Sequence, residues 1–144
     1  MKVLVQRVLN AKVDISNKTN GEINQGLLLF VGFTKGDNLT NINYLVNKII
    51  HLRIFDDENG VMNKSVLDIN GEILSISQFT LYADTKKGYR PSYSHALNSN
   101  EAIKLYELFN QELSKYIKVE TGVFGEEMQI SLKNDGPVTI ILEK

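Results

Sequence analysis

Short segments of alternating hydrophobic and polar positions occupy the first quarter of this chain. Residues 3–9 and 11–15 alternate with the period of two that is typical of β-strands. Asn17–Gly21 then supplies residues that favour a turn. Leu27–Phe33 is almost entirely apolar, and seven such residues suit a strand buried on both faces better than a helix. These patterns predict β-structure at the start of the chain.

Two later segments have apolar residues at helical spacing. The first runs from Ile42 to Ile50, with either Asn38 or Thr40 as its N-cap. The second begins near Asn98 or Ser99, and Glu101 lies three residues after Asn98, as in a capping box. Its apolar stripe consists of Ala102, Tyr106, Phe109, Leu113 and Tyr116.

The remaining apolar segments predict further strands. Arg53–Phe55 is a short strand candidate, Glu72–Tyr82 a long one, and residues 128–132 alternate again. Residues 134–137 have turn chemistry, and Val138–Leu142 follows as a closing strand.

The order of these elements sets the fold class. The two predicted helices do not alternate strictly with strands, which argues against a doubly wound parallel sheet. We expect a single α+β domain over residues 1–144. Its sheet should be curled, barrel-like and mostly antiparallel or mixed, with about seven strands and two covering helices.

Composition excludes several classes of site. The 144 residues carry a net charge of −1, so the whole-molecule basic field of many nucleic-acid binders is absent, although a local basic patch is compatible with it. There is no cysteine, which excludes disulfides and thiolate chemistry. His51 and His95 are far apart and lack the context of a Ser-His-Asp site, and the spacing in Asp56–Gly60 is that of a turn rather than a calcium loop. Carboxylates could still bind a hard cation, but we expect neither a metal nor a cofactor.

The N-terminal segment contains only a brief apolar stretch. It does not have the pattern of a signal peptide, and no run of about 20 apolar residues occurs in the chain. The sequence predicts a soluble cytoplasmic protein that does not bind membranes.

Ser77-Gln78-Phe79-Thr80 places polar side chains in a segment that otherwise looks like a core strand. Buried polar groups cost stability unless something uses them. In a regular strand the Ser77 and Thr80 side chains point to opposite faces, whereas a bulge or strand end near Gln78 brings them together. The alternative is an ordinary sheet strand whose small polar side chains bond to neighbouring backbone.

The segment Asn134–Thr139 also has two interpretations. It is a hairpin turn with Pro137 at the first position of the next strand, where a missing N–H is tolerated. Alternatively, Gly136 and Pro137 form a rigid backbone wedge that presents carbonyl oxygens to a pocket. Either isomer of the bond before Pro137 is compatible with the sequence.

Cationic side chains gather in the loop Thr85–Tyr93. Lys86, Lys87 and Arg90, together with two tyrosines, could contact phosphates and stack on bases, or they could form a solvated surface loop. Arg7 stands among apolar residues of the first strand. It either extends to solvent or binds a carbonyl or an anion inside a pocket.

Taken in order, these segments resemble the D-aminoacyl-tRNA deacylase family, and the resemblance runs nearly end to end. It rests on Val5–Val8, Gly26–Gly32, Phe55–Asp57, Met62-Asn63, Ser77–Asp84, Lys87-Gly88, Arg90–Ser92, Thr121–Gly125 and Asn134–Thr139. Each motif alone is a weak signal, and their co-occurrence in one chain is a strong one.

The resemblance implies an activity. The substrate is the ester between a D-amino acid, or mischarged glycine, and the 3′-terminal adenosine of a tRNA. It implies a homodimer with each active site at the subunit interface, and a cis bond between Gly136 and Pro137, which reach into the partner's site. A rigid main-chain wedge would exclude L-amino acids sterically and let glycine pass.

The resemblance also implies residue roles. Backbone N–H groups near Phe79 and Thr80 would stabilise the oxyanion, and Thr80 is either a nucleophile or a group that positions an attacking water beside the ribose 2′-hydroxyl. Arg7 would brace the wedge and Met128 would line its support. The implied catalytic residues are Ser77, Gln78, Phe79 and Thr80, and the implied tRNA contacts are Lys86, Lys87 and Arg90.

Two other functions remain open from the residues alone. One is a small RNA-binding module without catalysis, which the cationic loop favours. The other is a structural dimerisation domain.

Overall fold

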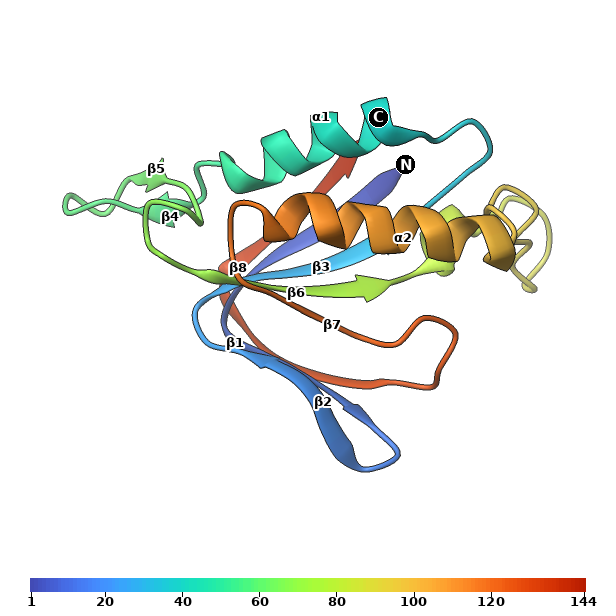
Figure 1. Cartoon of the computed structure of the whole chain (residues 1–144), viewed down its shortest axis with the longest axis horizontal. Coiled ribbons are helices and arrows are strands. Elements are labelled where there is room, and N and C mark those ends of the chain that lie inside the picture. Colours follow the sequence, from blue (N-terminus) through green and yellow to red (C-terminus); the bar gives the residue numbers. More distant parts are fainter.

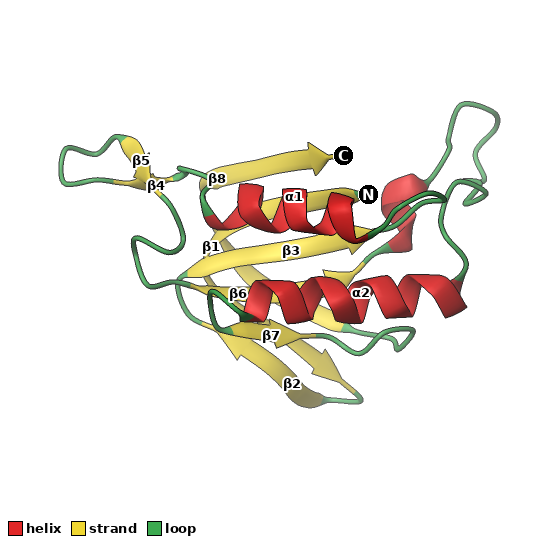
Figure 2. Ribbon diagram, turned by 45° about the horizontal axis from the view of Figure 1, so that its top comes forward, coloured by secondary structure: helices red, strands yellow, loops and turns green.

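A curled sheet with two helices on one face forms the body of the protein (Figures 1 and 2). The computed structural model describes residues 1–144. The strands are β1 (Lys2–Ile15), β2 (Lys18–Ile23), β3 (Gly26–Gly32), β4 (Phe55–Asp56), β5 (Met62–Lys64), β6 (Glu72–Ser77), β7 (Val119–Thr121) and β8 (Gln129–Glu143). The helices are α1 (Leu39–Ile50), the 3₁₀ helix η1 (Phe79–Tyr82) and α2 (Ser99–Ser114).

The main sheet has six strands and mixed direction. Its order is β2-β1-β3-β6-β7, and β8 pairs with β1. The pairs β3–β6 and β6–β7 are parallel and the others are antiparallel. β4 and β5 form a separate hairpin that extends from one end of the molecule (Figure 1). The predicted α+β class is confirmed, with eight strands in place of about seven.

The core lies on both faces of the central strands. A cluster of 19 buried residues fills the space around the two helices, and a second cluster of seven lies on the opposite face of β3 and β6. Leu27 and Leu29 belong to the first cluster and Leu28 to the second, and all three are fully buried. The apolar run of β3 is therefore explained by burial on both faces.

Helix boundaries follow the caps. Asn38, rather than Thr40, is the N-cap of α1, and its side chain accepts a hydrogen bond from the Thr40 N–H at 2.9 Å. Asn98 caps α2 by accepting from the Glu101 N–H at 3.2 Å. The prediction that Tyr116 belongs to the apolar stripe of α2 is wrong. The helix ends at Ser114, and Tyr116 is 58% exposed.

Several strand predictions need correction. The two predicted N-terminal strands are one strand, β1, because β8 pairs with both halves, although β3 pairs only with the first half and β2 only with the second. The turn expected at Asn17–Gly21 is confined to Ser16-Asn17, and β2 begins at Lys18. The short strands β5 and β7 have three residues each, too few to produce a periodic pattern.

The C-terminal prediction of two strands joined by a hairpin turn is wrong. β8 runs continuously from Gln129 to Glu143 and pairs with β1 on both sides of Arg7. Gln6 pairs with Thr139 and Val8 with Asn134, so residues 135–138 form a bulge opposite Arg7 alone. A bulge keeps the strand direction, whereas a hairpin would reverse it.

Candidate functional site

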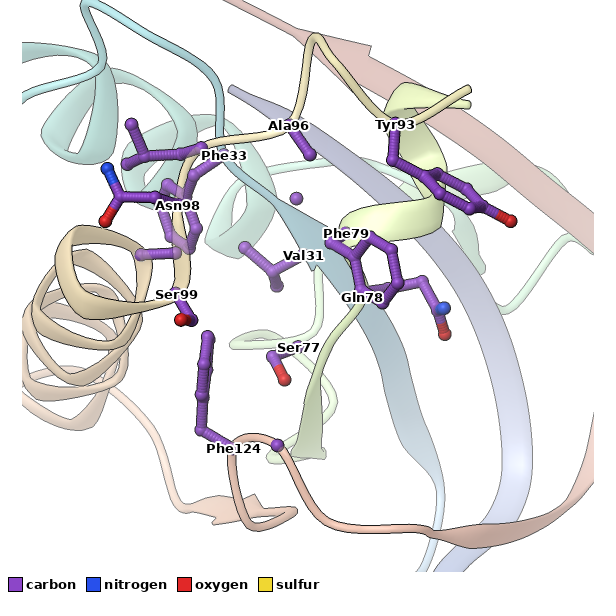
Figure 3. A pocket seen from close by; sticks show the side chains of 14 residues that line it. Val31, Phe33, Ser77, Gln78, Phe79, Tyr93, Ala96, Asn98, Ser99 and Phe124 are labelled. Atoms are coloured by element: carbon purple, nitrogen blue, oxygen red, sulfur yellow. The ribbon is translucent and has the colours of Figure 1, made fainter. Parts of the chain in front are cut away.

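A cavity of about 460 Å³ opens where β3 and β6 end, between η1, the start of α2 and the loop after β7 (Figure 3). Eight of its 14 lining residues are hydrophobic. Ser77 and Gln78 provide polar groups on one side, and Asn98 and Ser99 on the other. The cavity combines an apolar lining with a few polar groups, as small-molecule sites commonly do.

The strand predicted over Glu72–Tyr82 is shorter than expected. β6 ends at Ser77, and η1 turns the chain across the end of β3. Gly32 permits this close approach, because a Cβ there would lie 2.9 Å from the Gln78 carbonyl oxygen and 3.2 Å from the Leu81 Cβ. The strand end thus comes directly before the residues that line the cavity.

The strand end brings the predicted catalytic residues together. Ser77, Gln78 and Phe79 line the cavity, and the Gln78 backbone N–H donates to the Val31 carbonyl at 2.7 Å. Thr80 is not a lining residue, but its Oγ1 accepts a hydrogen bond of 2.6 Å from Gln78 Nε2. No basic side chain bonds to this hydroxyl.

Two aromatic rings stand at the mouth of the cavity. Phe79 is 57% exposed, and its ring meets that of Tyr93 edge to face with 5.0 Å between centroids. Exposed aromatic faces beside an apolar cavity offer a stacking surface for a flat ligand.

Sequence reasoning by residue chemistry missed the apolar walls of the cavity. Phe33, Ala102 and Phe124 line it, and Figure 3 shows Phe124 across from Ser77. Phe33 and Ala102 carry no signal beyond that of core residues. Phe124 lies within the Thr121–Gly125 motif that contributed to the family resemblance.

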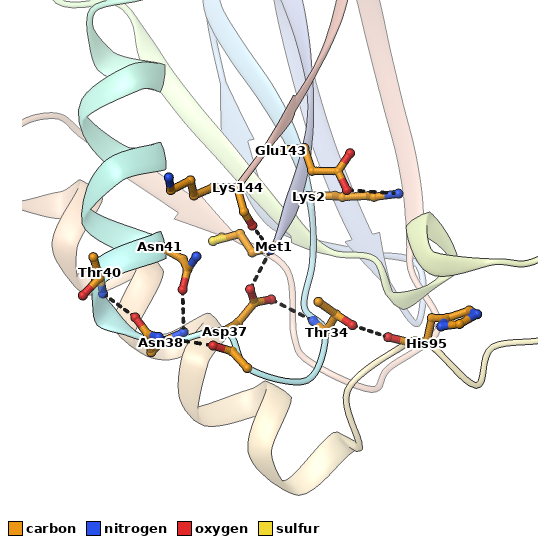
Figure 4. Close-up of polar contacts among 11 residues, drawn as sticks. Met1, Lys2, Thr34, Asp37, Asn38, Thr40, Asn41, His95, Glu143 and Lys144 are labelled. Carbon is orange, nitrogen blue, oxygen red and sulfur yellow. Dashed lines mark hydrogen bonds and ion pairs between the residues drawn. The ribbon is translucent and has the colours of Figure 1, made fainter.

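A chain of polar contacts supports the wall that contains Phe33 (Figure 4). The buried Met1 ammonium pairs with Asp37 at 2.6 Å, and Asp37 accepts the Thr34 N–H at 2.8 Å. The Thr34 hydroxyl donates to the His95 carbonyl at 2.6 Å, and the Leu97 N–H donates to the Phe33 carbonyl at 2.9 Å. These bonds fix the loop before α2 against the end of β3.

Arg7 is buried and holds two backbone segments together, so the alternative in which it extends to solvent is wrong. Its Nε bonds to the Asp135 carbonyl at 3.2 Å and lies 3.0 Å from the Asp135 carboxylate. Its Nη1 donates to the Ile54 carbonyl at 2.6 Å and lies 3.6 Å from Asp56. Arg7 therefore links the bulge of β8 to the base of the β4–β5 hairpin.

Gly136 and Pro137 are exposed at the top of this bulge, and the peptide bond between them is cis. They lie opposite Arg7, whereas the cavity begins at the level of Val31, which pairs with Val3. Four strand positions separate the two levels, or about 13 Å along the sheet. Within one chain, neither Gly136 nor Pro137 lines the cavity.

The other predicted residues lie outside the cavity as well. Met128 packs against the smaller core cluster, next to Gly122. Lys86, Lys87 and Arg90 are exposed and form no ion pair with a carboxylate. Their loop is closed at its base by the backbone pairing of Asp84 with Ser92. Neither histidine lines the cavity.

Residues 4–143 match the family described as D-Tyr-tRNA(Tyr) deacylase. The chain belongs to this family. A protein of Thermosipho africanus (strain TCF52B), named D-aminoacyl-tRNA deacylase, is 58% identical over 144 residues, which cover 99% of this chain and 97% of that protein.

Two solved structures share the fold. One, named c-Myc DNA Unwinding Element Binding Protein, is 38% identical with a TM-score of 0.95 and covers 100% of this chain and 99% of its own. The other, described as a probable eukaryotic D-amino acid tRNA deacylase, is 17% identical with a TM-score of 0.83, over 98% of this chain and 97% of its own. The second likeness shows the fold alone.

Membership of the deacylase family makes the protein an enzyme of the hydrolase class. The residues predicted to catalyse the reaction or select the substrate form two main groups on one chain. Ser77, Gln78 and Phe79 line the cavity with Thr80 bonded beside them, whereas Arg7, Gly136 and Pro137 lie at the bulge. None of the helices combines the length and apolar character needed to cross a membrane.

Proposed function

We propose that this protein hydrolyses the ester bond of D-aminoacyl-tRNA and releases the free D-amino acid and the tRNA. The observation that carries the proposal is the family match over residues 4–143, together with 58% identity to a protein named for this activity. Because the substrate is an aminoacyl-tRNA, the proposed compartment is the cytoplasm.

The cavity suits the 3′-terminal adenosine with its attached amino acid. Its apolar lining and the rings of Phe79 and Tyr93 offer a surface for the adenine base. The exposed cations Lys86, Lys87 and Arg90 contact the tRNA phosphates in this proposal. With a net charge of −1 for the whole chain, binding is modest in affinity and weakens as salt rises.

The hydrolytic chemistry takes place beside Ser77 to Thr80. η1 begins at Phe79, and the first N–H groups of a helix have no acceptor within it. The N–H groups of Phe79 and Thr80 stabilise the oxyanion that forms when the ester carbonyl is attacked, a contribution of about 3–4 kcal/mol per donor. The nucleophile is a water molecule positioned by Thr80, Gln78 and the ribose 2′-hydroxyl, because Thr80 has no base to activate it.

Selection against L-amino acids requires a second copy of the chain. Gly136 and Pro137 are exposed and lie about 13 Å along the sheet from their own cavity, so the site that uses both is assembled between two protomers of a homodimer. β8 has a free outer edge, and Ile141 on it is 64% exposed, which supports a partner on this side.

The wedge acts by occupying space. The backbone of Gly136 and Pro137 fills the volume that an L side chain needs. It makes no contact that depends on the identity of a D side chain. Arg7 holds the wedge through Asp135, and Met128 supports the neighbouring segment. Glycine has no side chain to exclude, so glycyl-tRNA is a second substrate.

The test is a paired time course with D-tyrosyl-tRNA, L-tyrosyl-tRNA and glycyl-tRNA. The proposal expects hydrolysis of the D and glycyl esters and no acceleration of L-ester loss above the uncatalysed rate. A non-catalytic RNA-binding module would protect or ignore all three, and equal hydrolysis of both enantiomers would disprove the selective role.

A further inference from the structure

A small polar cluster lies inside the main core, directly beneath the cavity. Tyr106, from α2, is buried, and its hydroxyl donates to the Ser75 carbonyl at 2.7 Å. The Ser75 and Asn110 side chains have buried polar atoms and lie beside the Tyr106 hydroxyl, within reach of a hydrogen bond to it.

This cluster is unusual within the protein. Ser75 is one of three buried polar or charged residues, with Arg7 and Ser65. The other two have their polar atoms bonded, Arg7 to backbone carbonyls and Ser65 to Asp68. The Ser75 side chain instead belongs to a polar cluster enclosed by the apolar core, together with Tyr106 and Asn110.

The cluster touches the strand that carries the proposed catalytic residues. The Ser75 carbonyl accepts from the Gly122 N–H at 3.0 Å as well as from Tyr106. Two residues later β6 ends at Ser77, whose side chain lines the cavity. The Tyr106 hydroxyl therefore fixes the end of β6, from Ser75 to Ser77, directly before Gln78.

The ring of Tyr106 reaches the opposite wall. Its centroid lies 6.1 Å from that of Phe124, which lines the cavity across from Ser77. One side chain of α2 thus contacts both sides of the site, one through its hydroxyl and the other through its ring. Burial raises the pKa of Tyr106 above its ordinary value, so the hydroxyl stays protonated and continues to donate across the neutral range.

We propose that Tyr106 is a positioning residue for the hydrolysis: its hydroxyl sets the end of β6 and hence Ser77 and Gln78, and its ring sets Phe124. This inference rests on the proposed function. It separates two effects, because the hydroxyl acts on the reacting groups and the ring acts on the wall that holds the substrate.

The test compares Tyr106→Phe with Tyr106→Leu in hydrolysis of D-tyrosyl-tRNA. Tyr106→Phe keeps the ring, so we expect kcat to fall about 10-fold while KM stays within about twofold. Tyr106→Leu removes the ring as well, so KM should also rise. Tyr116→Phe is the matched control, since Tyr116 is 58% exposed beyond the end of α2, and it should leave both constants unchanged.

A second measurement needs no substrate. Amide hydrogen exchange of residues 77–80 should accelerate in Tyr106→Phe and remain unchanged in Tyr116→Phe. A variant with a lower Tm, unchanged kcat and unchanged exchange at these amides would show a purely structural role and overturn the inference. If the wild type does not hydrolyse D-tyrosyl-tRNA, the proposed function fails. The exchange result alone then decides whether Tyr106 sets the end of β6.

Discussion

The Gln78 side chain shows how single residues define the chemistry of the cavity. Its amide donates to Thr80 Oγ1 at 2.6 Å, and no basic group is bonded to that hydroxyl. A threonine hydroxyl is a weak nucleophile without a base. The local geometry therefore favours a positioning role for Thr80 in the proposed reaction.

Replacing Thr80 by Ala should slow the proposed deacylation without abolishing it. We expect kcat for D-tyrosyl-tRNA to fall by at most about 100-fold, since the backbone N–H groups of η1 remain in place. Single-turnover kinetics and mass spectrometry of the quenched reaction would measure this. Complete loss of activity in a folded variant, with an acyl-enzyme trapped on the wild type, would instead establish a covalent route.

Gly136 occupies a backbone conformation that side chains rarely adopt, with φ of +118°. A Cβ there would lie 2.8 Å from Arg7 Nη2 and 2.9 Å from Val138 Cγ2. Gly136→Ala should therefore lower the free energy of unfolding by about 1–3 kcal/mol, displace the bulge and admit L-esters.

Gly88→Ala is the control for backbone strain. Gly88 also has a positive φ, of +68°, but a Cβ there would meet nothing within 4 Å. Denaturant unfolding and the ratio of D to L hydrolysis should be measured for both variants. An unchanged ratio in Gly136→Ala would contradict the wedge, whatever its effect on stability.

At the scale of elements, a surface ion pair ties three strands together. Glu72, at the start of β6, accepts from Lys118 Nζ at 2.8 Å, just before β7, and from the Asn24 N–H at 2.9 Å, just after β2. These contacts, with the Lys118 hydrogen bond as the largest cause, hold the pKa of Glu72 below its ordinary value of 4.5.

This lowered pKa predicts a contribution to folding stability that is lost in acid. Because the folded state favours the ionised carboxylate, the contribution is present above pH 4.5 and is lost as the pH falls towards the folded-state pKa. Glu72→Gln should therefore reduce the loss of Tm between about pH 5 and pH 3. Glu107 is exposed, so Glu107→Gln serves as the control. An identical change of Tm with pH in the wild type and in Glu72→Gln would refute the prediction.

At the scale of the whole molecule, the cavity and the Gly136-Pro137 bulge belong to different regions of one chain. If each site combines the cavity of one protomer with the bulge of the other, defects in the two regions can be separated in a mixed dimer. Such a dimer pairs a Gln78→Ala chain with a Gly136→Ala chain.

The mixed dimer should contain one site with both defects and one site with none. We expect it to recover about half of the wild-type selective activity, although each parent homodimer is impaired at both sites. Tagged co-expression, purification of the mixed dimer and the paired D and L assay would measure this. An assembly of two independent sites would recover none, and a mass of 16.3 kDa in solution would exclude the dimer.

Local patterns in the sequence were sufficient for much of the fold. Cap chemistry before the helical periodicities narrowed each helix start to two candidate residues, and the structure selects Asn38 for α1 and Asn98 for α2. The apolar run of β3 predicted burial on both faces, because its residues have no polar face to expose. The motifs, taken together, identified the family that the comparisons show.

Contacts between distant segments decided the rest. The end of β6 at Ser77 depends on close approach over Gly32, and the bulge of β8 depends on pairing with β1 on both sides of Arg7. The walls of the cavity, among them Phe124, have the composition of ordinary core. Local patterns record the preferences of short segments, whereas strand length, register and cavity shape arise from packing between residues far apart in the chain, and only the tertiary structure specifies those partners.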